Sequence, residues 1–210
     1  MAQAAGMRSI YNRWGWLFLV INLLAVGVLA VFGPAEKSLG SNVRVVYLHG
    51  AWVWTALAAM TLAGVTGLLG LSQRWRFLAN WSLAFGRTGL IFWITYLPLS
   101  LWAMQANWNG LFLSEPRWSL AIAFAISGIA LQIGLALVNR PLLIGLVNSG
   151  YVAALLILLG GAENVMHPRS PILDSRAMAI QFFFGALLVL TLLLGWQVNL
   201  FLLRMGRETR

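Results

Sequence analysis

Six runs of apolar residues, each about 17 to 27 residues long, dominate this chain of 210 residues. A helix that crosses the roughly 30 Å of hydrocarbon in a bilayer needs about 20 such residues. Only 9% of the chain is charged, against about 25% in a typical soluble domain. The sequence therefore predicts an all-α, polytopic integral membrane protein, a six-transmembrane-helix bundle that forms a single domain over residues 1–210. The predicted helices are 14–32, 45–71, 88–104, 119–138, 141–161 and 177–203.

Two stretches fit this pattern less simply. Residues 77–87 mix aromatic and polar side chains, and such an amphipathic composition is typical of a segment that lies along the membrane interface. The first run follows two arginines, as a signal peptide would. Its apolar stretch of about 19 residues is long for a signal peptide, however, and no A-x-A cleavage site follows it cleanly. We therefore interpret it as the first transmembrane helix.

The charged residues predict how the bundle is oriented. With six spans, nine of the 14 Lys and Arg residues fall on the side of the termini, including Arg87 just before the third predicted helix. The positive-inside rule therefore predicts cytoplasmic N and C termini. Four of the five acidic residues and both histidines fall on the outer side, so any chemistry is expected there. Because the basic residues are spread in ones and twos between apolar runs, they indicate membrane orientation and not a nucleic-acid partner.

Two absences narrow the function further. The chain has no cysteine, which excludes disulfides, thiolate metal sites and iron–sulfur clusters within it. No Asp, Glu or Lys falls inside a predicted span. This argues against an ion-coupled transporter with a charged relay at the midplane.

One histidine, His49, lies in the stretch VVYLHGAWVW that opens the second run. A helical rise of about 1.5 Å per residue puts it about 37 Å from Arg74, and therefore at the outer end of the helix. Trp52 lies three residues further on and shares its face. An aromatic belt at a membrane interface has a similar composition. The residues alone therefore leave His49 as either an interfacial side chain or a ligand.

The second histidine, His167, lies before the sixth run, on the same predicted side. A six-coordinate heme iron takes two axial ligands, and two imidazoles from distant segments can approach it from opposite faces. Outer arginines such as Arg117 suit the propionates, because a guanidinium matches a carboxylate bidentately. Zinc is a poorer alternative that would use Glu163, His167 and Asp174, since Pro168 and the neighbouring glycines make this loop irregular.

A third outer stretch, WNGLFLSEPRW at residues 108–118, combines aromatic, acidic and basic side chains. Trp108 and Phe112 suit the flat face of a porphyrin, while Glu115 and Arg117 supply charge. An interfacial loop with belt aromatics and a Glu–Arg pair would look the same.

Taken in order, these three stretches resemble the CcmC/CcsA heme-handling superfamily of cytochrome c assembly proteins, and CcmC most closely. That family opens its second helix with a segment reading roughly I-I-Y-L-H-V-P, which corresponds to VVYLH at residues 45–49. Its second histidine lies in the last outer loop, where this chain has His167. Its WWD motif, roughly W-G-x-W-W-x-W-D-x-R, corresponds to residues 108–117. Trp108 and Arg117 match, Glu115 replaces the acid, and three tryptophans are replaced, at Leu111, Phe112 and Ser114.

The resemblance extends over about residues 10–205 and implies a function. It implies a non-enzymatic carrier that holds non-covalent b-type heme at the outer face of the plasma (inner) membrane. The heme would pass to a heme chaperone or an apocytochrome, beside ABC-type cytochrome c maturation subunits. The lost tryptophans leave open a heme-retaining or heme-free subunit of an electron-transfer complex. The implied axial ligands are His49 and His167, and the other implied heme contacts are Trp52, Trp108, Phe112, Glu115 and Arg117.

Overall fold

The computed structural model describes residues 2–163, 165, 172 and 177–208, with the backbone alone for 2–13 and 207–208. The predicted six helices are confirmed, and all six are long and apolar enough to span a membrane. A 3₁₀ turn, η1 (Gln73–Trp75), separates the second from the third. The helices are α1 (Ala2–Val31), α2 (Val43–Leu69), α3 (Leu78–Trp108), α4 (Pro116–Val138), α5 (Pro141–Gly161) and α6 (Met178–Glu208).

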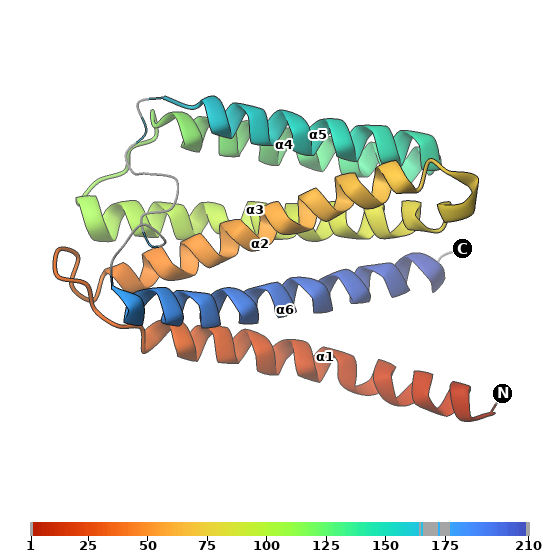
Figure 1. Cartoon of the computed structure of the whole chain (residues 1–210), viewed down its shortest axis with the longest axis horizontal. Coiled ribbons are helices and arrows are strands. Elements are labelled where there is room, and N and C mark those ends of the chain that lie inside the picture. The colour runs from red at the N-terminus through yellow and green to blue at the C-terminus, as the bar shows by residue number, and fades with distance from the viewer. Residues whose placement is uncertain (1, 164, 166–171, 173–176, 209–210) are drawn as a thin grey trace.

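The helices pack around a central pair formed by α2 and α3 (Figure 1). On one side of this pair lie α4 and α5, and on the other lie α6 and α1. Both chain termini lie at the same end of the bundle, which we call the terminal end. The opposite end carries the α1–α2 turn and the α3–α4 loop, and we call it the distal end. That the distal end faces the outer side of a membrane stays a prediction.

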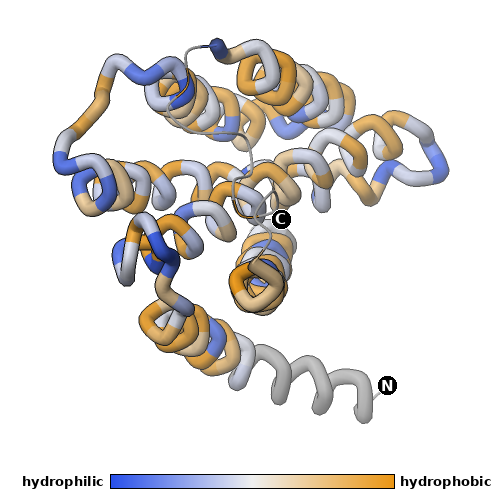
Figure 2. Tube along the Cα trace, turned by 60° about the vertical axis from the view of Figure 1, so that its left-hand side comes forward, coloured by the Kyte–Doolittle hydropathy of each residue, from blue (hydrophilic) through white to orange (hydrophobic). Residues whose placement is uncertain are grey.

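Large apolar side chains are exposed along the outward faces of the helices. Polar residues gather mainly at the turns between them (Figure 2). Soluble monomers rarely expose contiguous apolar patches larger than a few hundred Å². This surface therefore suits contact with lipid, consistent with a multi-pass membrane protein. Examples of the exposed side chains are Phe18, Leu24, Ile126, Ile157 and Phe182.

Local sequence explains where several helices begin and end. Pro116 and Pro141 occupy the first turns of α4 and α5, where a missing N–H costs nothing. Asn109 and Asn139 follow α3 and α4 in the left-handed conformation, with φ of 51° and 48°. Asparagine tolerates this conformation better than most residues do, so it ends a helix readily.

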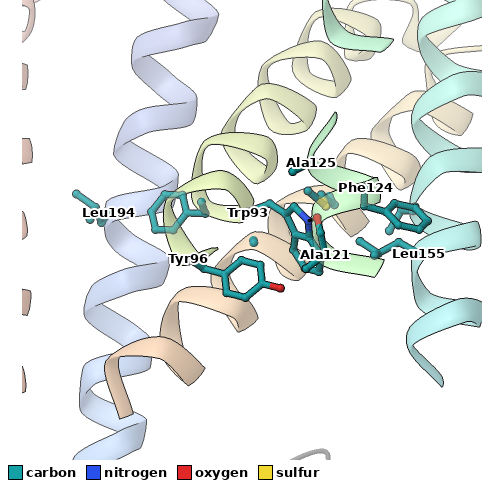
Figure 3. Packing of buried hydrophobic residues seen from close by; sticks show 11 residues of the cluster. Trp93, Tyr96, Ala121, Phe124, Ala125, Leu155 and Leu194 are labelled. Carbon is teal, nitrogen blue, oxygen red and sulfur yellow. Dashed lines mark hydrogen bonds between the residues drawn. The ribbon is translucent and has the colours of Figure 1, made fainter. Parts of the chain in front are cut away.

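The largest buried cluster lies between the central pair and α4, α5 and α6 (Figure 3). Trp93 of α3 is its largest fully buried side chain. The indole Nε1 of Trp93 donates a hydrogen bond to the carbonyl oxygen of Ala121, 3.0 Å away. This bond fixes α3 against α4 and satisfies a polar group that would otherwise be costly to bury.

The third helix begins ten residues before its predicted start. Residues 78–87 form the first turns of α3, and 77–87 are not a separate interfacial segment. Ser82, the buried polar residue of this stretch, is satisfied inside the bundle. Ser82 Oγ donates to the Ala63 carbonyl oxygen at 2.7 Å and accepts from Asn148 Nδ2 at 2.9 Å. The amphipathic pattern therefore reflects contact with α2 and α5, and not with headgroups. Arg87 accordingly lies within α3, and not in a loop.

Close helix packing depends on glycine between α2 and α5. A Cβ atom on Gly67 would lie 2.9 Å from the Cα of Gly145, and one on Gly145 would lie 2.6 Å from the Gly67 carbonyl oxygen. Real Cβ atoms essentially never approach so closely. The two backbones can therefore touch only because neither residue has a side chain, a common device in membrane helices.

Candidate functional site

The turn between α1 and α2 is held in place by its own hydrogen bonds. The backbone N–H groups of Leu39 and Ser38 donate to Glu36 Oε2 at 3.0 and 2.8 Å, and they hold the pKa of that carboxyl below its usual value. Arg44 Nε donates to the Gly33 carbonyl oxygen at 2.8 Å. The first turn of α2, which leads to His49, is therefore fixed to the end of α1.

His49 lies in the second turn of α2, at the distal end, and is half-buried. Its ring packs against Tyr96 of α3, with the ring centroids 5.5 Å apart and the planes tilted by 54°. Tyr96 in turn packs edge-on against Trp93, at 4.9 Å (Figure 3). The imidazole is thus positioned by an aromatic series that runs from α2 through α3. The distal placement agrees with the position inferred from the sequence.

Trp52 lies one turn further along α2 and contacts α3. Its indole Nε1 donates to Thr95 Oγ1 at 2.8 Å, and its ring lies 4.8 Å from that of Phe92. This side chain therefore helps to pack α2 against α3. Its predicted heme contact would have to use the part of the ring that this packing leaves accessible.

The α3–α4 loop presents apolar side chains at the distal end. Trp108 ends α3 with 38% of its surface exposed, and Phe112 is 39% exposed. Leu111 and Leu113 beside them are more exposed still. The end of α3 is tied to the start of α2, because Asn42 Nδ2 donates to the Ala106 carbonyl oxygen at 2.7 Å. The exposed side chains of the predicted site at residues 108–117 and the first turns of α2, which carry His49, therefore lie at the same end of the bundle.

Glu115 caps the first turn of α4. Its Oε2 accepts a hydrogen bond from the Trp118 backbone N–H at 2.7 Å. The side chain is only 9% exposed, and Oε1 is buried without a hydrogen-bond partner among the described residues. One carboxylate oxygen thus stabilises the start of α4, while the other is buried without a hydrogen bond to any described residue.

Replacing Glu115 by alanine is expected to lower the free energy of unfolding by about 0.5–2 kcal/mol, because the α4 cap is lost. Glu115→Gln should stay close to the wild type, since the amide oxygen can still accept from Trp118. The thermal unfolding midpoint in detergent measures both effects. Equal midpoints for Glu115→Ala and the wild type would show that the cap does not stabilise this loop.

Part of the α5–α6 loop can be followed at Ile172. This residue is buried with Val43, Tyr47 and Ala51 of α2 and with Phe184 of α6. A Cβ atom on Gly50, the neighbour of His49, would lie 3.9 Å from Ile172 Cδ1. The loop therefore returns to α2 beside His49. The predicted ligand His167 and the alternative zinc ligand Asp174 lie outside the described residues.

No metal centre is evident in the part of the chain that is described. These residues contain no group of three His, Cys, Asp or Glu side chains that could hold an ion. A cavity of about 10 Å³ lies among α2, α3, α4 and α5, lined in part by Gln132 and Asn148. That volume is enough for about one water molecule. It is far too small for a porphyrin, and its position beside Ala63 is about 21 Å along α2 from His49.

Comparison of the chain with known proteins finds no matching family model, no similar curated protein and no similar solved structure. The class is therefore defined by fold and site alone: a six-helix bundle suited to a membrane, with an imidazole and exposed aromatic rings at its distal end. Two parts of this site are absent from the sequence prediction, Tyr96 and Ile172. Neither carries a signal of its own, because each becomes relevant only through the register between helices.

Proposed function

We propose that this protein binds heme at its distal end and passes it to a heme chaperone or an apocytochrome during cytochrome c maturation. The observation that carries the proposal is the position of His49, which is half-buried at the distal end and oriented by Tyr96. The proposal assigns His49 and His167 as the two axial ligands. When bound, heme would supply a redox-active iron; the chain would supply its position and its release.

The residues at the distal end have suitable chemistry for this group. Neutral imidazole is a common axial ligand of heme iron. Trp108 and Phe112 expose aromatic surface at the same end, which suits a flat apolar macrocycle. Arg117, in the first turn of α4, would pair with a propionate.

Chain geometry is compatible with a second ligand from the α5–α6 loop. Five peptide links separate His167 from Ile172, so their Cα atoms are at most about 18 Å apart. Ile172 itself is packed beside Gly50. The terminal end of α2 is much further away than that, because this helix, with 27 residues, is about 40 Å long. The proposal therefore requires His167 to lie at the distal end, beside His49.

Heme titration followed by a transfer assay tests the proposal. Protein purified in detergent should develop a Soret band that saturates at one heme per chain. The loaded protein should then lose heme to an added apocytochrome faster than heme is lost to buffer. No Soret band would leave a heme-free subunit, whereas a band that persists beside the acceptor would indicate a heme-retaining subunit of an electron-transfer complex.

A further inference from the structure

Arg87 is the basic residue placed deepest in a candidate membrane span. It is the tenth residue of the 31-residue α3. The other basic residues within the six spans, Arg44, Arg117 and Arg204, lie within three residues of a span's end. A charged side chain inside hydrocarbon is costly and is usually paired. Arg87 therefore requires an explanation that the distal site does not provide.

The neighbouring helices α4 and α5 show how far the Arg87 backbone lies from the terminal end of the bundle. A Cβ atom on the adjacent Gly86 would lie 2.7 Å from Gln132 Nε2 and 3.1 Å from Asn148 Oδ1. Gln132 lies six residues before the terminal end of α4, and Asn148 lies seven residues after the start of α5. At about 1.5 Å per residue, the Arg87 backbone is roughly 9–11 Å inside that end. In a bilayer about 30 Å thick, this is well within the hydrocarbon.

Arg87 lies on the face of α3 that points away from the bundle. Ile91 and Trp102 are four and fifteen residues further on, at helical spacing, and are 41% and 59% exposed. Residues on the opposite face pack against α2: Ser82 donates to the Ala63 carbonyl oxygen. Arg87 itself is half-buried. Its side chain is therefore partly accessible from the side of the bundle, and its backbone lies at the depth of the acyl chains.

Among the residues that the structure describes, none supplies a counter-ion for this guanidinium at that depth. None of the described residues forms a hydrogen bond or an ion pair with Arg87. The five acidic residues all lie outside the six candidate spans. A second copy would bring another arginine to the same face, and so repulsion. A counter-ion at that depth would therefore come from a different molecule. The five are Glu36, Glu115, Glu163, Asp174 and Glu208.

We propose that the outward face of α3 around Arg87, Ile91 and Trp102 is a docking surface for a transmembrane helix of another protein. That helix would carry one Asp or Glu at the depth of Arg87, because a carboxylate accepts two hydrogen bonds from a guanidinium. A lipid phosphate fits less well, since it lies beyond the hydrocarbon and Arg87 begins roughly 9–11 Å inside. This interface is independent of heme binding at the distal end.

A synthetic single-span helix of leucine and alanine provides the probe. The full-length protein is labelled at Ser72→Cys, which is unique because the chain has no cysteine, and is reconstituted in phosphatidylcholine vesicles. Energy transfer then measures binding of peptides with Glu or Gln about 10 Å from one end of the apolar segment. The Glu peptide should bind about three- to tenfold more tightly than the Gln peptide. A peptide with Glu at the very end of the segment should lose most of this preference.

Variants at two arginines decide the outcome. Arg87→Gln should abolish the preference for the Glu peptide, Arg87→Lys should keep part of it, and Arg140→Gln, at the α4–α5 turn, should leave it unchanged. Monodisperse elution and an unchanged unfolding midpoint show that each variant is folded. Equal binding of both peptides, or a preference that persists in Arg87→Gln, overturns the proposal. In mixed phosphatidylcholine–phosphatidylglycerol vesicles, Arg87-dependent enrichment of phosphatidylglycerol without any preference between peptides also overturns it, in favour of a lipid site.

Discussion

Replacing Gly67 by valine is expected to lower the free energy of unfolding by at least about 1–3 kcal/mol, the cost typical of an overpacked core. The added side chain would begin 2.9 Å from the Gly145 Cα and from Ser82 Oγ, so α2 and α5 would have to separate. That separation would also disturb the hydrogen bond from Ser149 Oγ to the Gly64 carbonyl oxygen, 3.0 Å long. The measurement is the thermal unfolding midpoint in detergent, followed by tryptophan fluorescence.

Two other glycines serve as matched controls. Gly150 lies on α5 and Gly134 on α4, and a Cβ atom at either position would have no neighbour within 4 Å. Alanine is favoured over glycine in a helix by about 0.8–1.0 kcal/mol, so Gly150→Ala and Gly134→Ala should match or exceed the wild-type midpoint. If Gly67→Val unfolded at the wild-type midpoint, the close packing of α2 against α5 would be wrong.

The second large effect concerns the proposed heme ligand. His49→Gly is expected to remove the Soret band at equimolar heme, because the iron would lose one of its two axial ligands. Free imidazole should restore the band, since the small ligand can occupy the space that the side chain leaves. Such rescue separates loss of a ligand from loss of the fold. The absorption spectrum at increasing imidazole concentrations is the measurement.

Trp54→Ala is the control for this variant. Trp54 is an aromatic residue of the same helix, five positions from His49, and is 42% exposed. Because it lies on another face, its removal should leave the Soret band in place. Loss of the band in Trp54→Ala, or an unchanged band in His49→Gly, would contradict the assignment of His49.

The six apolar runs were sufficient to predict the six helices, because a bilayer demands length and apolarity whatever the packing. The start of α3 was not predictable in the same way. Asn80, Ser82 and Arg87 give residues 77–87 an amphipathic pattern, which indicates an interface when water is assumed to satisfy the polar side. In the structure Asn148 and the Ala63 carbonyl satisfy Ser82 instead. A pattern of polar residues in one segment does not show whether their partners are other residues of the protein or lipid headgroups.

The candidate site was predictable only in part. The distal position of His49 follows from its distance to Arg74 along one helix, which the sequence contains. Its contact with Tyr96 depends on the register between α2 and α3, which hydropathy does not specify. The cap formed by Glu115 is local, since an acidic residue before proline at a helix start is a common N-cap arrangement. The role of Ile172 arises only from packing between segments far apart in the chain.

The central claim is that two imidazoles from one end of the bundle bind a single iron. Electron paramagnetic resonance of the ferric heme complex tests it most directly, with the wild type compared with His49→Ala and His167→Ala. The account predicts a low-spin, six-coordinate signal in the wild type that becomes high-spin, or is lost together with the heme, in each variant. A wild-type complex that is high-spin, or a low-spin signal that survives either substitution, would contradict it.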